Sequence, residues 1–149
     1  MDVFVYGTLT RGERNHDRFC RGALRIREAT IHGRLYDLPF GFPALVAPDE
    51  SVLAVGTLDY AADAERQRST VPEMIPAQGD IVHGELLTFD DPLTRLPALD
   101  GLEGFRPGEE SLYRRVLIRA RAEGETTAVW AYVVERPSGE YLPGGRWPA

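Results

Sequence analysis

Short runs typical of β-strands follow one another along this chain, and few stretches carry helical signals. The clearest run spans residues 112–120, where side chains alternate between two sets as they would on the two faces of a strand. About six strands at this spacing favour a closed or nearly closed antiparallel sheet over a parallel one. A chain of 149 residues can bury a substantial core, so we expect a single domain over residues 1–149. The remaining β-rich runs are residues 2–6, 24–36, 52–60, 81–89 and 126–135.

Two stretches carry the signals of short helices. Residues 13–21 form one of them, with Phe19 on its inner face. In the other, over residues 92–102, leucines recur at helical spacing after Pro92, which suits the first turn of a helix. The composition shifts over residues 61–79. The first part is rich in alanine and charged residues and could be helical, and two prolines follow it. We expect this segment to form an insertion or a flap.

Composition and charge exclude several classes of function. The formal net charge of −6 gives no electrostatic support to nucleic-acid binding. All 17 basic residues are arginines, so the chain offers no lysine as a general base or for a Schiff base. No apolar run reaches the roughly 18 residues of a membrane-spanning helix, and Asp2 near the start does not fit a secretory signal. Together with the single Cys20, which fits a reducing compartment, these features predict a cytoplasmic protein.

The end of the first strand is the first candidate for a functional site. The apolar run that ends at Tyr6 leads directly into Gly7, Thr8 and Leu9. Glycine allows a sharp turn with a positive φ, after which several N–H groups can point outward together and hold a carboxylate or an oxyanion. Thr8 could hydrogen-bond a substrate carboxylate or cap the following helix, and Tyr6 could lie in the core or line a pocket. An ordinary β-turn explains the same residues about equally well.

The second candidate is a single carboxylate at the end of the predicted 92–102 helix. Glu103 follows the leucine stripe directly and precedes Gly104, which should end the helix. A carboxylate held beside apolar side chains has a raised pKa, which suits a group that moves protons near neutral pH. The simpler interpretation is an exposed acid at a helix end. Asp100 fits a hydrogen-bonding role there better than it fits a coupled pair with Glu103.

The other reactive residues do not form a recognisable constellation. The three histidines lack the spacing of zinc ligands, and no serine lies in the pattern of a nucleophile elbow. No glycine-rich phosphate or dinucleotide fingerprint is present. Cys20 fits a small buried residue better than a nucleophile, although nearby arginines could lower its pKa. The sequence therefore predicts neither a metal site nor a cofactor.

Several motifs, taken in order, resemble one family of proteins. Each motif is short, and their order and spacing make the match specific. The first is Tyr6-Gly7-Thr8-Leu9, and the others are residues 11–16, 33–38, 41–45, 82–86, 99–105 and 112–115. The chain resembles the gamma-glutamylcyclotransferase-like proteins, which include the AIG2-like and gamma-glutamylamine cyclotransferase branches. The resemblance covers most of the chain, with a gap near the middle.

The resemblance implies an α+β fold, a small mixed and mainly antiparallel β-barrel with short packed helices. It also implies a reaction in which a γ-glutamyl amine or γ-glutamyl amino acid cyclises to 5-oxoproline and releases the free amine. Glu103 matches the family's catalytic acid, and the loop of residues 6–9 matches the substrate loop. Tyr113 and, with less weight, Tyr132 match tyrosines that line the pocket. The implied partner is a small γ-glutamyl substrate, without cofactor or metal.

Two alternatives remain open from the sequence. The same barrel could be a non-catalytic domain that binds or senses a small molecule, and the distinction depends on whether Glu103 shares a cavity with the amides of residues 7–9. The leaving amine is also undefined, because residues 48–80 would wall that part of the pocket and lie outside the resemblance. We expect the flap of residues 61–79 to contact the leaving amine through Val71, Met74 and Ile75. A solvent-exposed excursion without a role is the alternative.

Overall fold

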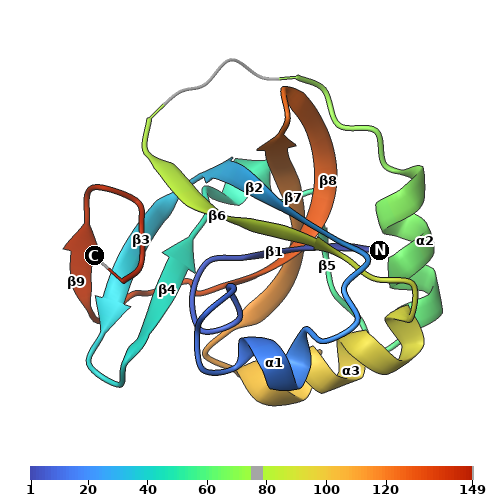
Figure 1. Cartoon of the computed structure of the whole chain (residues 1–149), viewed down its shortest axis with the longest axis horizontal. Helices are drawn as coiled ribbons and strands as arrows, with labels where there is room; N and C mark the ends of the chain where they lie inside the picture. Colours follow the sequence, from blue (N-terminus) through green and yellow to red (C-terminus); the bar gives the residue numbers. More distant parts are fainter. Residues whose placement is uncertain (75–78, 149) are drawn as a thin grey trace.

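A closed β-barrel forms the centre of the protein, whose computed structural model describes residues 1–74 and 79–148. Neighbouring strands of the barrel are antiparallel except for β1 and β8, which run parallel, and β7 pairs back with β2 between Arg121 and Thr30. The expected small mixed, mainly antiparallel barrel is therefore confirmed. Around the barrel the order is β2 (Arg25–His32), β6 (Ile81–Thr88), β1 (Asp2–Val5), β8 (Glu125–Val133) and β7 (Arg114–Ala122) (Figure 1).

A smaller sheet lies beside the barrel and consists of β4 (Phe42–Val46), β3 (Arg34–Leu38) and β9 (Glu140–Leu142). The predicted single run over residues 24–36 is in fact divided between the barrel and this sheet. The break is at Gly33, where a Cβ atom would lie 2.8 Å from the Val46 carbonyl oxygen. The C-terminal tail is ordered against the same sheet, because the Trp147 indole donates a hydrogen bond of 3.0 Å to Asp37 Oδ1.

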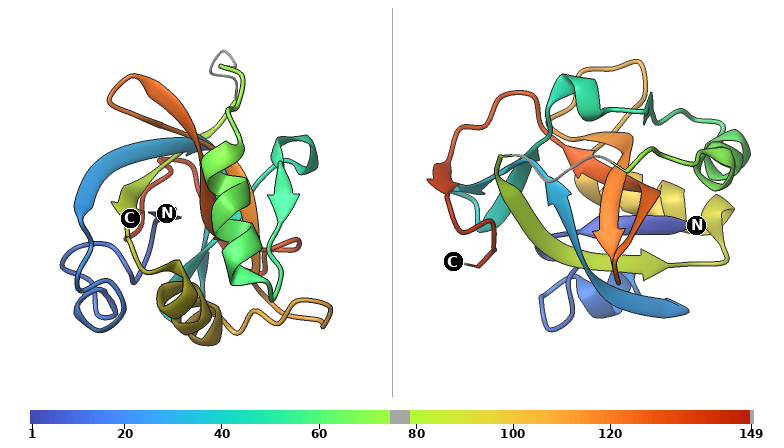
Figure 2. Two further views of the ribbon diagram at one scale, coloured as in Figure 1. Left: turned by 90° about the vertical axis from the view of Figure 1, so that its right-hand side faces the viewer. Right: turned by 90° about the horizontal axis from the view of Figure 1, so that it is seen from above.

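Three α-helices lie outside the barrel, and α3 (Pro92–Glu103) contacts both α1 (His16–Phe19) and α2 (Tyr60–Ser69). The described chain also has the short 3₁₀ helix η1 (Asp49–Ser51). Figure 2 shows α2 and α3 next to one another outside the barrel wall. None of these helices is long and apolar enough to cross a membrane.

Both faces of the barrel wall are buried, which explains the two alternating sets of side chains in β7. Val116 and Ile118 belong to one apolar cluster with Phe4. Leu117, on the other face, belongs to a second cluster that includes Leu99 of α3. Successive strand residues point to opposite faces, so one strand contributes to both clusters.

The predicted strand over residues 52–60 is largely wrong. Only β5 (Ala54–Val55) is a strand, and it pairs with the edge of β7 opposite β8. The chain then passes Gly56, where a Cβ atom would lie 2.7 Å from the guanidinium carbon of Arg115. This close approach requires glycine, and it brings the chain into α2 instead of extending the strand.

The expectation of a flap over residues 61–79 is wrong for the first half of that segment. This half is α2, which buries Asp63 and Gln67 against the rest of the protein. The Gln67 side-chain amide donates a hydrogen bond of 3.0 Å to the Ala128 carbonyl of β8. Val71 and Met74 are exposed and do not line the cavity described below, and Ile75 lies outside the described residues.

Candidate active site

A cavity of about 340 Å³ opens where β1 ends beside the C-terminal end of α3. Its wall combines the loop after β1 with residues of α3, β4 and β8 and with the segment that leads into β7. Segments from both ends of the chain therefore meet in one cavity. The predicted site residues all line it, namely Tyr6, Gly7, Thr8, Leu9, Glu103 and Tyr113, and so does Tyr132.

The loop after β1 is held in place through its carbonyl groups. The carbonyl of Gly7 accepts hydrogen bonds from the amide and hydroxyl of Thr10, at 3.0 and 2.7 Å. The carbonyl of Thr8 accepts from the Asn15 amide at 2.9 Å, and the Leu9 carbonyl lies 2.8 Å from His16 Nδ1. Within residues 1–74 and 79–148, the amides of Gly7, Thr8 and Leu9 donate no hydrogen bond. The loop thus offers unpaired N–H donors at the cavity wall, as an anion site requires.

Gly7 is required for a reason other than the one expected from the sequence. Its φ is not positive, so the predicted left-handed turn is wrong. A Cβ atom on Gly7 would instead lie 2.6 and 2.7 Å from Cγ and Cδ of Pro43, closer than real carbon contacts allow. Glycine lets the loop pack directly on β4, which fixes the position of the following amides.

Replacement of Gly7 by alanine should destabilise the protein through this contact. Forcing an extra methyl group into packed surroundings costs about 1–3 kcal/mol of unfolding free energy. The measurement is urea unfolding of the variant and the wild type. Gly144→Ala is the control, because a Cβ there meets no atom within 4 Å, and its effect should stay within about 0.5 kcal/mol. Equal stability of the two variants would contradict the close packing of Gly7 on Pro43.

Glu103 occupies the last position of α3 and lines the cavity as a half-buried side chain. The helix ends there because Gly104 adopts a left-handed conformation at φ 68°, with its N–H bonded to the carbonyls of Asp100 and Gly101. Burial raises the pKa of Glu103 to about 7, and the nearby negative charge of Asp100 adds to the shift. The negative end of the helix dipole acts in the same direction. Glu103 can therefore exchange a proton near neutral pH.

The raised pKa of Glu103 predicts a pH-dependent effect of Glu103→Gln on stability. Between about 4.3, the value for an unfolded chain, and about 7, the folded protein keeps a proton that the unfolded chain has lost. The carboxyl group therefore makes the folded state less favourable as pH rises through this window, and glutamine does not. We expect the free energy of unfolding of Glu103→Gln, relative to wild type, to be higher at pH 8 than at pH 5. Denaturant unfolding at both pH values measures this difference, and a constant difference would mean that the pKa is not raised.

The three tyrosines of the cavity hold the surrounding elements together. The hydroxyl of Tyr6 donates to the Tyr132 carbonyl, that of Tyr113 to the Pro43 carbonyl, and that of Tyr132 to Asp100 Oδ1, each at 2.6 Å. Burial raises the pKa of all three above the ordinary value for tyrosine, and the charge of Glu103 adds to the shift. These phenols therefore stay neutral at physiological pH, and Glu103 is better suited than they are to accept a proton.

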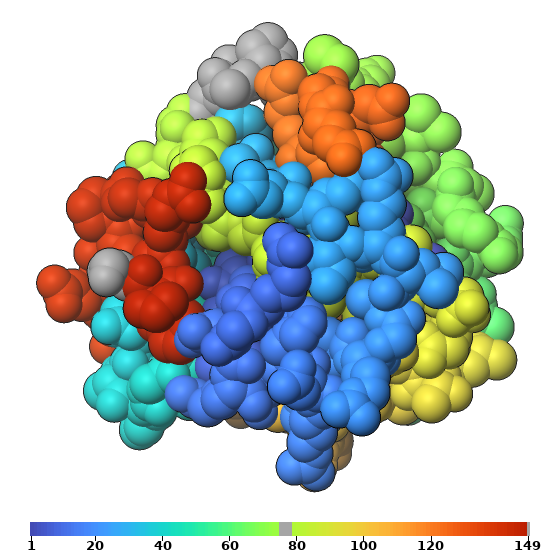
Figure 3. Space-filling model, in the orientation of Figure 1, coloured from blue at the N-terminus to red at the C-terminus, as the bar shows by residue number. Residues whose placement is uncertain are grey.

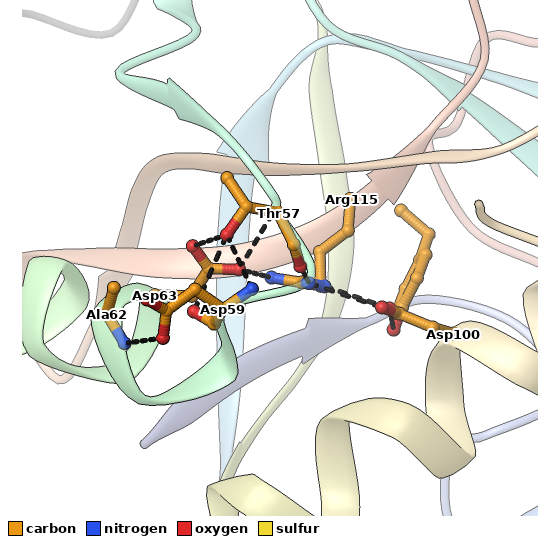
Figure 4. Close-up of polar contacts among 7 residues, drawn as sticks. Thr57, Asp59, Ala62, Asp63, Asp100 and Arg115 are labelled. Carbon is orange, nitrogen blue, oxygen red and sulfur yellow. Dashed lines mark hydrogen bonds and ion pairs between the residues drawn. The ribbon is translucent and has the colours of Figure 1, made fainter. Parts of the chain in front are cut away.

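A buried ionic network lies behind Glu103 and joins α2, α3 and β7. The guanidinium of Arg115 is fully buried, and its Nε and Nη2 donate to the two oxygens of Asp100 at 2.8 and 3.2 Å. Its Nη1 donates to Asp63 at 3.0 Å, and Nη2 also reaches the Thr57 carbonyl at 3.1 Å. Figure 4 shows Asp63 and Asp100 approaching the guanidinium from opposite sides. This network fixes Asp100, which lies one helical turn before Glu103 and helps to raise its pKa.

Sequence reasoning missed Arg115 and Asp63. Arg115 lies in the alternating run of β7 next to other arginines, where a charged side chain is usually exposed. Asp63 lies in the segment assigned to a flap. Arg115 lies two residues before Leu117, so both side chains lie on the same face of the strand. Sharing a face with an apolar residue is the sequence signal that could have indicated burial of Arg115. Asp100 accepts hydrogen bonds at the helix end, as predicted, but from a fully buried partner.

The remaining reactive side chains do not contribute to the cavity. Cys20 is buried, its thiol donates to the Leu9 carbonyl at 3.7 Å, and burial raises its pKa to about 12. It is therefore a poor nucleophile. In the described part of the chain, His, Cys, Asp and Glu side chains form no group of three that could hold a metal ion.

Comparison with known proteins identifies the family of this chain. The chain matches the family described as "Gamma-glutamyl cyclotransferase, AIG2-like" over residues 3–69 and 59–149, and it belongs to this family. Among curated proteins, it is 28% identical over 137 residues to the gamma-L-glutamyl-butirosin B gamma-glutamyl cyclotransferase of Niallia circulans. That match covers 91% of this chain and 67% of the relative.

Solved structures share the fold at low sequence identity. YkqA from Bacillus subtilis matches 98% of this chain with a TM-score of 0.61 and 20% identity, and the chain spans only 39% of that protein's length. An AIG2-like protein from Mus musculus matches 92% of this chain with a TM-score of 0.55 and 19% identity, over 79% of its own length. An uncharacterised protein from Pyrococcus horikoshii gives a TM-score of 0.56 at 17% identity, with 99% of this chain and 89% of that one covered.

Proposed function

We propose that this protein converts a γ-glutamyl amine or γ-glutamyl amino acid to 5-oxoproline and the free amine. The observation that carries the proposal is the shared cavity of Glu103 and the unpaired amides of residues 7–9. A group that exchanges protons near neutral pH thus lines the same cavity as a set of donors for negative oxygen. A domain that only binds its ligand has no need of such a proton carrier, so the catalytic interpretation is favoured over the binding one.

The reaction uses the substrate's own nucleophile. The α-amine attacks the γ-carbonyl carbon, and Glu103 accepts the proton that leaves this nitrogen as the ring closes. The bond between the γ-carbon and the leaving nitrogen then breaks, and Glu103 delivers the proton to that nitrogen. The proton taken from the α-amine is thus the one given to the leaving nitrogen, and Glu103 returns to its carboxylate form.

The loop after β1 would act on the oxygen of the reacting carbonyl. Negative charge develops on this oxygen as the nitrogen attacks, and the amides of Gly7, Thr8 and Leu9 are available to stabilise it. Because the ring closes within one molecule, a cavity that holds the substrate in a bent conformation can supply several kcal/mol of the barrier, up to about 7–11 in ideal cases. The role of the cavity wall is therefore largely to orient the chain of the γ-glutamyl group.

A substrate panel tests the proposed reaction. The purified protein is incubated with γ-glutamyl amides of amino acids, simple amines and diamines, and with γ-L-glutamyl-butirosin B, and 5-oxoproline is quantified. We expect enzyme-dependent formation of 5-oxoproline from at least one of them. α-Glutamyl amides serve as the control, because their γ-carboxylate is not an amide and cannot release an amine by this route. Absence of 5-oxoproline across the panel would contradict the proposal.

A further inference from the structure

The mouth of the cavity has an aromatic side formed by the turn between β3 and β4. Phe42 lines the cavity, and its ring lies 6.3 Å from that of Tyr113 at an interplanar angle of 50°. Phe40 stacks on Phe42 at 5.9 Å and 25°, with 70% of its surface exposed. Leu112, also in the cavity wall, is 53% exposed. The apolar wall therefore continues from inside the cavity onto the open surface.

A positive charge borders this wall. Arg14 lines the cavity, and its Nη1 would lie 3.7 Å from a methyl group placed on Gly41, the residue between the two phenylalanines. Within residues 1–74 and 79–148, the Arg14 guanidinium makes no hydrogen bond or ion pair. By contrast, the neighbouring Arg11 is paired with Glu85. Figure 3 shows the N-terminal segment of the chain, in dark blue, against the cyan region that contains β3 and β4.

These residues lie beyond the catalytic groups, at the opening of the cavity. Glu103 is on the last turn of α3, whereas Phe40 and Arg14 are exposed. A γ-glutamyl group that places its γ-carbonyl near Glu103 and the loop amides would extend its amine portion toward the opening. The leaving amine is therefore the part of the substrate that meets the aromatic wall and the free guanidinium.

We propose that Arg14, Phe40, Phe42 and Leu112 form the subsite for the leaving amine, and that it selects an amino acid with an apolar side chain. Arg14 binds the carboxylate of this leaving amino acid, and the apolar wall contacts its side chain. This assignment rests on the proposed cyclotransferase function. It also means that the substrate selection expected from residues 61–79 lies instead in the loop after β1, the β3–β4 turn and Leu112.

Charge complementarity supports the assignment. A γ-glutamyl amino acid carries two carboxylates at neutral pH, one on each half, whereas a γ-glutamyl amine carries one. Arg14 is the only cationic side chain among the described residues that line the cavity, and it suits a substrate with the additional carboxylate. A guanidinium suits a carboxylate because its planar fork can donate two parallel hydrogen bonds. The positive charge of Arg14 should disfavour a leaving group that carries a second, protonated amino group, such as a diamine.

A matched pair of substrates tests the role of Arg14. γ-Glutamyl-phenylalanine and γ-glutamyl-2-phenylethylamine differ only in the carboxylate of the leaving group. We expect wild-type kcat/KM to favour the former, and Arg14→Gln to lower the ratio of the two kcat/KM values about fivefold, the upper end for an exposed charge pair. Arg14→Lys should retain most of the preference. Arg21→Gln is the control, because Arg21 is exposed and does not line the cavity, and it should leave the ratio at the wild-type value.

A second pair tests the apolar wall. Phe40→Ala should lower the ratio of kcat/KM for γ-glutamyl-phenylalanine over γ-glutamyl-glycine about fivefold, because the exposed ring provides contact area and little stability. An equal loss on both members of either pair would overturn the subsite. For Arg14, such a result would mean that the guanidinium binds the γ-glutamyl half.

A binding measurement separates failure of the subsite from failure of the proposed function. Calorimetric titration of the Glu103→Gln variant with the matched phenylalanine and phenylethylamine compounds does not depend on turnover. Tighter binding of the phenylalanine compound, reduced about fivefold by adding Arg14→Gln, supports the subsite even if 5-oxoproline is never formed. Equal affinity for both compounds overturns it even if the enzyme is active.

Discussion

Replacing Glu103 by glutamine is expected to lower kcat on a γ-glutamyl substrate by about 10²–10⁴, the usual contribution of a general acid–base group. Glutamine keeps the shape of the side chain and can still donate a hydrogen bond, but it cannot accept the proton of the attacking amine. The Michaelis constant should change little, because the loop amides and the aromatic wall remain. Steady-state kinetics with 5-oxoproline as the readout measures both quantities.

The control for this variant is Glu110→Gln, which makes the same change at an exposed residue seven positions later that does not line the cavity. It should leave kcat within about twofold of the wild type, because surface changes rarely affect a distant site. The acid limb of the wild-type pH profile should fall below a pH of about 7, since Glu103 must be ionised to act as a base. Full activity of Glu103→Gln would show that another group moves the proton.

The parts of the site that could be predicted from the sequence are those with local signals. The loop after β1 follows an apolar run and begins with glycine, and Glu103 lies between a leucine stripe and Gly104. Each signal is contained within about a dozen residues, so pattern and resemblance were enough to place these residues together. The positive φ expected at Gly7 was nevertheless wrong. Glycine is required there because the loop packs against Pro43, which is distant in the sequence.

The parts that were missed depend on long-range packing. Pro39, Gly41 and Pro43 predict turns, yet Pro43 lies within β4, which is a strand because it pairs with β3. The flap was expected because residues 61–79 carry charge and prolines, whereas α2 is held by Asp63 and Gln67, two polar residues with buried partners. Composition marks such residues as exposed, and only the assembled barrel supplies the groups that satisfy them.

Replacing Arg115 by methionine should cost about 3–5 kcal/mol of unfolding free energy, the effect of removing one partner from a buried ionic network. The change leaves Asp63 and Asp100, both nearly fully buried, without the guanidinium that now hydrogen-bonds them. Denaturant unfolding measures the loss. Arg114→Met is the control on the same strand, because its ion pair with Glu135 is partly exposed, and removing it should cost at most about 1 kcal/mol.

We expect Asp63→Asn to have opposite effects on the free energy of unfolding in the wild-type chain and in the Arg115→Met chain. In the wild-type chain, Asp63→Asn should lower the free energy of unfolding, because it weakens a buried pair in which Arg115 Nη1 lies 3.0 Å from the carboxylate. In the Arg115→Met chain, Asp63→Asn should raise it, because a buried charge without a partner is replaced by a neutral amide that can still accept the hydrogen bond from the Thr57 amide. A double-mutant cycle measures both effects. Destabilisation by Asp63→Asn in both backgrounds would mean that Asp63 acts through its bonds to Thr57, and that Arg115 is not its main partner.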